Sequence, residues 1–547
     1  MSSELPSQAL KLSKYKLRVN VRLAEARRSE FAKRLASKDP NLWAAESAED
    51  ANDRLGWLNL PEDSRVIVPQ LEDLVRMIRS QGYKRVFLLG MGGSSLAAEV
   101  FERTFGDPQK KFIRIADSTH PDAVRRWIDE VDSDQYFFIV SSKSGSTLET
   151  RALFHVFWHA MERWHSQPGL RFAAITDSGS FLEWLANDRG FVQVFTAPQD
   201  VGGRYSALSA FGLVPGALSG LDIDLLLTRA RVMAEACESD ASPGVELGVA
   251  LGELALAGRD KLTFVASPKV ASFADWLEQL VAESLGKGGK GIVPVVRETP
   301  GAAETYGDDR VFVGIVLEGD ENGAPEWLEQ RAGEGHPVIE IRLRDRYDLG
   351  CEILRWEVAV ATAGSVLRVQ PFDQPDVERS KILTRGALAA TGEDMPEPPP
   401  AIDCREGVKV RAALVEWMEA IRPGQYAAVQ AFLAPDQKLM QALGAFQAAL
   451  RDRTGCAVTS GYGPRFLHST GQLHKGGPNS GVFLQIVDRP GSDLLVPEHE
   501  YSFATLIRAQ ADGDAAALAE GGRRLLRLEV VGNAADTVDR LRKIVED

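Results

Sequence analysis

The sequence predicts an α/β protein made of two doubly wound parallel-sheet domains and a smaller C-terminal α+β domain. Three observations lead to this class. Short apolar runs alternate with helical segments between residues 66 and 200, the alternation resumes after residue 260, and a third group of strands and helices follows a Pro-rich segment. The expected division is an N-terminal helical segment, a first sheet domain, a second sheet domain and a C-terminal domain, at residues 1–60, 61–235, 236–400 and 401–547.

The composition of the chain limits the kinds of protein to which it can belong. A chain of 547 residues exceeds the size of one hydrophobic core, and its net charge of -14 argues against a nucleic-acid surface but not against a small anionic substrate. The four cysteines are far apart, which indicates neither a metal site nor a disulfide framework. Without a secretory or membrane-length apolar run, the chain is expected to be cytoplasmic.

The first sheet is expected to have five strands after a segment of polar helices at residues 1–60. The apolar runs are Val86–Leu89, Phe112–Ile115, Tyr136–Val140, Phe172–Ile175 and Val192–Phe195. Ligands of such sheets bind at the carboxyl ends of the strands. The first run ends in Gly90-Met91-Gly92-Gly93-Ser94 and the third in a Ser/Thr-rich turn, so both turns should border one crevice.

The turn Ser142-Lys143-Ser144-Gly145-Ser146-Thr147 joins the third strand to a helix that begins at Leu148. Backbone N–H groups, hydroxyls, a lysine and the positive end of the helix dipole converge there, which favours a bound phosphate. Ordinary helix capping is the alternative, but it explains one hydroxyl and not all five, counting Ser141 directly before the turn. The glycine turn at residues 90–93 lacks the third glycine of a dinucleotide fingerprint, so a nicotinamide enzyme is disfavoured.

A second glycine turn, Gly202-Gly203-Arg204, can bring the backbone close to a ligand and present a guanidinium beside it. The alternative is a surface turn with an arginine salt bridge.

The second sheet is expected from the strands and helices Leu262–Ala266, 271–284, Val311–Leu317, Val338–Arg342 and Cys351–Leu367. Gln279 and Glu283 share one face of its first helix, because they are four residues apart. The helix dipole disfavours a carboxylate near a helix C-terminus, so Glu283 is either a solvated residue or one retained for chemistry.

Two prolines frame a turn at residues 371–375, and the helix that follows places Lys381 two turns beyond Gln374. By itself this pattern favours a helix start with a solvated lysine. Met395–Pro400 is the clearest linker.

The C-terminal domain reads as a split βαβ, ferredoxin-like unit. The expected strands and helices are Tyr426–Leu433, Gln437–Asp452, Ala457–Ser460, Val482–Val487, Tyr501–Leu518 (with a break at Gly513), Leu525–Val531 and Asp536–Val545. A loop inside it carries His468 and His474, which alone would pass for surface histidines.

Together these motifs resemble the glucose-6-phosphate isomerase (phosphoglucose isomerase) family over most of residues 60–390. Five segments carry the likeness in the family's order: Gly90–Ser94, Ser142–Thr150, Val201–Ser206, Gln279–Lys287 and Phe372–Lys381. The C-terminal domain and its histidine loop look most like the isomerase half of transaldolase–isomerase fusion proteins, although no transaldolase half is present.

The resemblance implies two sugar-isomerase (SIS) type domains and interconversion of glucose 6-phosphate and fructose 6-phosphate through a cis-enediol, with no metal or nicotinamide cofactor. Glu283 would be the base, Arg204 would stabilise the enediolate, and His468 with Lys381 would open the sugar ring. The residues expected to bind substrate are Gly93, Ser94, Ser142, Lys143, Ser144, Thr147, Gly203, Gln279 and Gln374.

The position of the candidate ring-opening histidine in the sequence differs from the family pattern. Family members carry it between the base helix and the Phe-Asp-Gln motif, where this chain has only His336, in a segment unlike theirs. Leu467-His468-Ser469 does resemble their segment, so His468 is the first candidate and His474 the second. Because the family's histidine reaches the site from a partner subunit, a homodimer is implied.

Two other functions stay open. A non-catalytic SIS regulator that binds a phosphosugar would need the Ser142–Thr147 turn but not Glu283, Arg204 and Lys381 together. The other is an isomerase that also accepts mannose 6-phosphate; Thr147 and Gln374 bear on this choice, and the sequence leaves the stereochemistry at C2 open.

Overall fold

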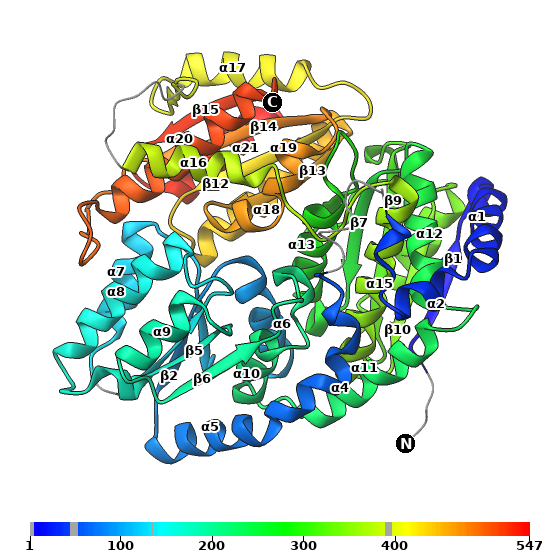
Figure 1. Ribbon diagram of the computed structural model, residues 1–547. Coiled ribbons are helices and arrows are strands. Elements are labelled where there is room, and N and C mark those ends of the chain that lie inside the picture. The colour runs from blue at the N-terminus through cyan, green and yellow to red at the C-terminus, as the bar shows by residue number, and fades with distance from the viewer. Residues whose placement is uncertain (1–4, 44–52, 134, 389–396) are drawn as a thin grey trace.

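The computed structural model describes residues 5–43, 53–133, 135–388 and 397–547, which form three five-stranded sheets with helices around them (Figure 1). The four cysteines are free thiols, as their spacing predicted. Among the described helices, none is both long and apolar enough to cross a membrane.

The first sheet confirms all five predicted strands. It is parallel, in the order β3-β2-β4-β5-β6, with β2 Arg85–Leu89, β3 Ile113–Ala116, β4 Tyr136–Ser141, β5 Phe172–Asp177 and β6 Gln193–Ala197. Along β2, Val86 and Leu88 pack into one core and Phe87 and Leu89 into another. Because both faces are covered, the strands read as continuous apolar runs. The surrounding helices are α5 Val68–Gln81, α6 Leu96–Phe105, α7 Pro121–Glu130, α8 Leu148–Glu162, α9 Phe181–Asp188 and α10 Ala210–Leu218.

The second sheet has the order β1-β10-β9-β7-β8. Its strands are β1 Ser7–Lys11, β7 Lys261–Ala266, β8 Val293–Val295, β9 Arg310–Leu317 and β10 Val338–Leu343, and only β1 is antiparallel. Its helices are α11 Ile223–Cys237, α12 Pro243–Leu256, α13 Phe273–Leu285, α14 Ala324–Gly333 and α15 Leu349–Leu367.

The N-terminal segment is not only helical, as the sequence had suggested. It supplies β1 before the helices α1 Lys16–Arg28, α2 Phe31–Ala36 and α4 Leu60–Asp63. The strand has no apolar run because it lies at the sheet edge with its residues exposed or half-buried, and its backbone pairing with β10 holds it there.

The ferredoxin-like prediction for the C-terminal unit is wrong. Its sheet is fully parallel, in the order β11-β15-β14-β12-β13, with β11 Ile402–Asp403, β12 Tyr426–Phe432, β13 Ala457–Tyr462, β14 Gly481–Asp488 and β15 Arg524–Val530. A ferredoxin-like unit would need antiparallel neighbours. Instead, the connection from β13 to β14 includes the helix α19 Gly471–Gly476 and passes to the other side of β12, as a parallel crossover requires. The unit is therefore a third doubly wound sheet.

The other helices of this unit are α17 Gly407–Glu419, α18 Gln437–Thr454, α20 Phe503–Glu520 and α21 Ala534–Glu546. No break occurs in α20 at Gly513. That glycine is required instead by the close packing of α16 Val377–Leu388, since a Cβ there would lie 3.0 Å from Thr384 Oγ1. Of the predicted linker Met395–Pro400, residues 395 and 396 lie outside the described residues, and 397–400 contain neither helix nor strand.

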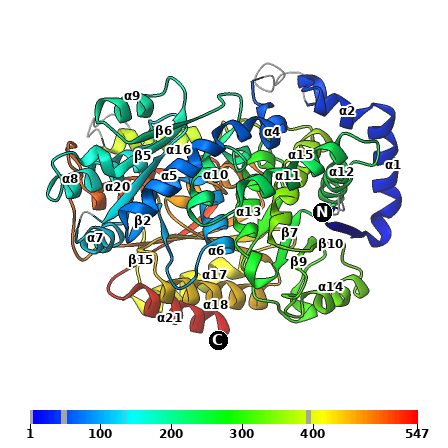
Figure 2. The ribbon, with the colours of Figure 1, turned by 90° about the horizontal axis from the view of Figure 1, so that it is seen from below.

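The three units pack against one another, and the third lies across the other two (Figures 1 and 2). One hydrophobic core runs through the first and second units, and Phe503 and Leu506 of the third join the other core of the first sheet. Loops from all three units can therefore meet at the junction.

Candidate active site

The Ser/Thr-rich turn joins β4 to α8 as predicted. The hydroxyl oxygens of Ser142 and Thr147 are 3.1 Å apart, and those of Ser144 and Ser146 are 2.7 Å apart. Thr147 occupies the N-cap position, yet its side chain makes no capping hydrogen bond to α8 in the described structure. Capping therefore does not account for these hydroxyls, and the first N–H groups of α8 remain available to an anion.

A cavity of about 490 Å³ opens beside this turn. Its walls include six of the predicted substrate-binding residues, namely Ser94, Lys143, Ser144, Thr147, Gly203 and Gln374. Arg54 and Asp177, which the sequence did not single out, also line it. The ammonium of Lys143 pairs with the carboxylate of Asp177, so its charge is shared between that carboxylate and the cavity.

Arg204 connects the cavity to the second unit. Its side chain is only 2% exposed, so the surface-turn alternative is wrong. Its Nη1 lies 3.1 Å from Glu283 Oε1 and donates to Gln374 Oε1 at 3.0 Å, while Nη2 donates to two backbone carbonyls of residues 371–373. Gln374 also lines the cavity, so Arg204 contacts one of the cavity walls and Glu283 lies behind that contact.

The glycines explain how the loops come so close. A Cβ on Gly93 would lie 2.2 Å from the carbonyl oxygen of Gly203, and a Cβ on Gly92 would lie 2.6 Å from that of His468. Side chains at either position would separate the loops. The first unit's two glycine turns and the third unit's histidine turn thus form one surface.

Glu283 lies in the last turn of α13, where its carboxylate is held from two sides. Arg204 contacts Oε1, and Gln279 Nε2 donates to Oε2 at 3.0 Å. The same Gln279 nitrogen donates to the backbone carbonyl of His468 at 2.8 Å. The base helix and the histidine turn are therefore joined through one amide.

His468 reaches the site from the third unit of the same chain. Its Nε2 lies 2.9 Å from Glu149 Oε1, which also accepts a hydrogen bond from Gln510 Nε2 at 2.8 Å. Burial by itself would raise the pKa of Glu149, but the charge and hydrogen bond of His468 keep that pKa below its ordinary value. Sequence reasoning missed this carboxylate as a functional group, because an acid in the first turn of a helix is common and Gln510 is 361 residues away.

The other two histidines considered from the sequence lie elsewhere. His474 is buried between Phe466 and Phe483, and burial lowers its pKa well below the usual value. His336 lies against Phe312, with its Nδ1 3.1 Å from Arg259 Nη1. Both are core residues, so His468 is the histidine that reaches the predicted site.

The two lysines near the site differ. Lys381 is half exposed on α16, and its Nζ donates to Glu378 Oε1 at 2.6 Å; its charge contributes to lowering the pKa of Glu149. Lys287, which the sequence did not single out, is 5% exposed, and its Nζ donates to Asp373 Oδ1 at 2.6 Å. Burial and the nearby Arg204 lower the pKa of Lys287 to about 8.

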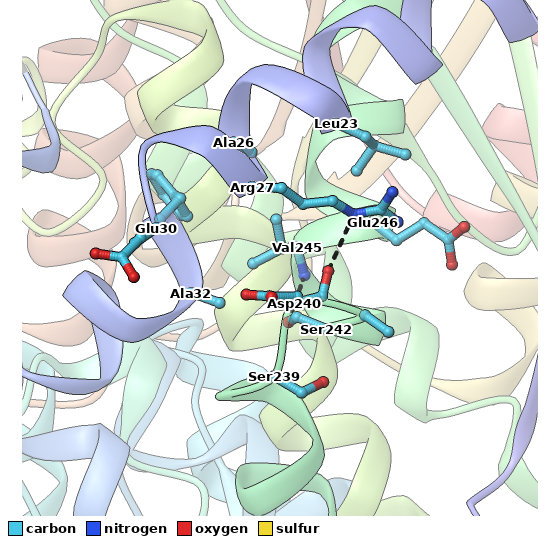
Figure 3. A pocket seen from close by; sticks show the side chains of 12 residues that line it. Leu23, Ala26, Arg27, Glu30, Ala32, Ser239, Asp240, Ser242, Val245 and Glu246 are labelled. Atoms are coloured by element: carbon cyan, nitrogen blue, oxygen red, sulfur yellow. Dashed lines mark hydrogen bonds between the residues drawn. The ribbon is translucent and has the colours of Figure 1, made fainter.

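A separate cavity of about 120 Å³ lies between the N-terminal helices and the turn before α12 (Figure 3). Arg27 closes one side, and its Nε donates to the carbonyl of Asp240 at 3.1 Å. Of the residues that the structure describes there, none is a predicted site residue, so we place no chemistry in it.

Comparisons with known proteins show which family this chain resembles. A family model described as phosphoglucose isomerase matches residues 74–300. The glucose-6-phosphate isomerase of Rubrobacter xylanophilus is 28% identical over 395 residues, covering 62% of this chain and 90% of the relative. That of Symbiobacterium thermophilum is 30% identical over 382 residues, covering 60% and 85%.

Two solved structures extend the likeness. A hypothetical protein of Thermus thermophilus is 25% identical, with a TM-score of 0.58 over 70% of this chain and 100% of its own. A glucose-6-phosphate isomerase of Chlamydia trachomatis has a TM-score of 0.52 at 18% identity, over 70% and 81%, which shows a shared fold.

Proposed function

The chain belongs to the phosphoglucose isomerase family, and we propose that it interconverts glucose 6-phosphate and fructose 6-phosphate. One observation carries the proposal: the carboxylate of Glu283 is held by Arg204 and Gln279, and the same Arg204 donates to Gln374 in the wall of the cavity that the Ser142–Thr147 turn borders. A phosphate on that turn would leave the other end of a hexose directed at the carboxylate.

In the proposed chemistry, Glu283 removes the proton from C2 of the open-chain aldose. The C–H electrons form the C1–C2 double bond of a cis-enediolate, while O1 becomes negative and is protonated. The same carboxylate returns its proton to C1 as the O2 hydroxyl proton is lost, which completes the ketose. One group can serve both carbons because they are adjacent on one face.

Arg204 would stabilise the charge that develops on the enediolate oxygens. One well-placed donor contributes about 3 kcal/mol to such a step. Its five contacts hold the guanidinium in place before substrate arrives, so little reorganisation is needed during the reaction. Ser284 takes part in this support by accepting from Nε at 2.8 Å.

Ring opening needs an acid and a base near the ring oxygen and O1. His468 suits this step because an imidazole exchanges protons near neutral pH, and its contact with Glu149 would orient the ring. We propose Lys381 as its cationic partner, which requires the ammonium to exchange Glu378 for substrate. The remaining predicted residues, Gly93, Ser94, Ser142, Lys143, Ser144, Thr147, Gly203, Gln279 and Gln374, would bind phosphate and hydroxyls.

A coupled assay for fructose 6-phosphate made from glucose 6-phosphate tests the function. Glu283→Gln should lower kcat by about 10³-fold or more while glucose 6-phosphate still binds in calorimetry, because the amide cannot take the C2 proton. Glu278→Gln, on the same helix, is the matched control and should keep wild-type turnover. Binding without turnover in the wild type would instead indicate a phosphosugar regulator, and equal turnover of mannose 6-phosphate would indicate the broader isomerase.

We also propose the homodimer, the kinship with isomerase halves of transaldolase–isomerase fusions, and a cytoplasmic location. The third unit with its His468 turn supports the kinship. His468 and Glu149 belong to one chain here, so specific activity should not fall on dilution even if the dimer dissociates. Light scattering and an activity–dilution series test both points, and a loss of activity in step with dimer dissociation would mean that a second chain completes the site.

A further inference from the structure

The histidine turn of the third unit is held against the first unit by a partly buried arginine, Arg465. Arg465 opens the 3-10 turn Arg465–His468, three residues before the candidate ring-opening histidine. Its Nη1 lies 3.0 Å from Asp117 Oδ2, just after β3, and its Nη2 pairs with Glu99 on α6. Two elements of the first unit thus hold one side chain of the third.

Glu99 and Arg465 keep their charges at this contact, whereas burial raises the pKa of Asp117. Burial alone would raise the pKa of Glu99, but Arg465 and then Arg103 lower it to about 2. Burial would likewise lower the pKa of Arg465, yet Glu99 and Asp117 raise it. Removal of one member of a buried ion pair leaves an uncompensated charge, so the contact resists displacement.

The anchor lies next to the contacts that set the position of His468. Gly92, one turn before α6, is so close to the His468 carbonyl that a Cβ would approach it to 2.6 Å, and Gln279 donates to that same carbonyl at 2.8 Å. A shift of the turn would therefore change the distance from His468 to both Glu149 and Glu283. Arg465 lines a different cavity, of about 620 Å³, rather than the one beside the phosphate turn.

We propose that Arg465 is a positioning residue that holds the His468 turn against the first sheet and thereby sets the reach of His468 toward the sugar ring. This inference rests on the proposed function. It assigns Arg465 no contact with substrate.

The chain offers a matched control in Arg103. Its Nη2 lies 2.6 Å from Glu99 Oε1, so it neutralises the same carboxylate, but it is half exposed and belongs to α6 rather than to the histidine turn. Arg103→Met and Arg465→Met each remove one cation from Glu99. Only Arg465→Met also releases the turn.

In the experiment, kcat for glucose 6-phosphate should fall about tenfold or more in Arg465→Met, because a small displacement of a catalytic group lowers the rate by such factors. In Arg103→Met, kcat should stay near the wild-type value. Calorimetric binding of erythrose 4-phosphate, which cannot close a ring because its C4 oxygen carries the phosphate, should be unchanged in both. Arg465→Lys should recover part of kcat, because it keeps a cation between Glu99 and Asp117.

Equal losses in the two methionine variants, or no loss in Arg465→Met, would overturn the proposal. If Arg465→Met does not fold, Asp117→Asn, which removes one of the two partners, replaces it with the same expected split. If the wild type has no isomerase activity, the proposed function fails separately. Hydrogen exchange of residues 465–470 then decides the anchor: faster exchange in Arg465→Met than in Arg103→Met supports it, and equal exchange contradicts it.

Discussion

The first and second sheets share the order of four parallel strands but bring opposite ends of their βα units to the site. β2 lies between β3 and β4 in the first sheet as β7 lies between β8 and β9 in the second. In the first, the turn at the carboxyl end of β4 borders the cavity. In the second, the turn after β9 is Glu318-Gly319-Asp320-Glu321-Asn322-Gly323, whose acids would repel a phosphate. The second unit contributes Glu283 instead, from the C-terminal end of α13.

This difference shows that topology selects possible sites and that loop chemistry selects among them. The rule that ligands bind at the carboxyl ends of parallel strands locates the phosphate turn but not Glu283. A carboxylate at a helix C-terminus is opposed by the helix dipole. Arg204, from the first unit, offsets that cost at 3.1 Å, so the second unit's candidate base depends on the first unit's cation.

Among the tests of this comparison between the two units, the largest effect is expected from breaking the contact between Glu283 and Arg204. Arg204→Met should lower kcat by about 10²-fold or more with little change in KM, because it removes a donor aimed at developing charge. Steady-state kinetics with glucose 6-phosphate measures it. Ser284→Ala keeps the guanidinium and removes only the hydroxyl that accepts from its Nε, so kcat should fall far less. Similar losses of kcat in the two variants would mean that the position of the guanidinium, and not its charge, decides the rate.

The crevices at the carboxyl ends of the strands in the first and second sheets can be compared by one substitution in each. Thr147→Val removes a hydroxyl from the phosphate turn at constant shape and should raise KM about tenfold, the cost of one hydrogen bond to a charged group. Lys269→Met changes a side chain in the turn after β7, where the backbone N–H of residue 269 donates to Asp320 of the turn after β9, and should leave KM unchanged. An effect of Lys269→Met on KM would place phosphate at the second crevice.

The pH dependence of kcat/KM tests the contact of Lys287 with Asp373. With its pKa lowered to about 8, it loses its charge beside Asp373 in mildly alkaline solution, so kcat/KM should decline above pH 8 by a few-fold. Lys287→Met should have a lower kcat/KM than the wild type at pH 7, and its kcat/KM should not decline above pH 8. Between pH 8 and the ordinary pKa of 10.5 the unfolded chain binds the extra proton, so wild-type stability should rise with pH across this window. If kcat/KM of Lys287→Met still declines above pH 8, the decline is caused by a group other than Lys287.

The smallest expected effect concerns Glu357, on α15 behind the site. It is fully buried, no hydrogen bond is made by its carboxyl oxygens in the described structure, and burial raises its pKa well above 4.5. The folded chain keeps this proton where the unfolded chain has lost it, so stability falls as pH rises above 4.5. Glu357→Gln needs no proton, and its Tm should exceed the wild-type Tm by a few degrees at pH 8.5 but not at pH 5. Exposed Glu238→Gln is the control, and an equal gain at both pH values would argue against a protonated Glu357.

Local patterns predicted most of the first two sheets because strands covered on both faces must be apolar throughout. The same reasoning missed β1, an edge strand with polar residues, and misassigned the C-terminal unit, because the apolar runs of β13 and β14 do not reveal on which side of β12 each strand pairs. Only the long connection through α19 decides that, and its path depends on packing against α13.

The sequence by itself determined the doubly wound class of the first two sheets and the Ser142–Thr147 turn between β4 and α8, and it named that turn, Glu283, Arg204 and His468 as candidates, since each depends on neighbours within a few positions. Tertiary structure alone decided which histidine reaches the site, that Glu149 and Gln510 meet it, and that Lys287 is buried beside Arg204. Those contacts join residues hundreds of positions apart. Their geometry is set by how three cores pack together, and no local pattern in the chain records that.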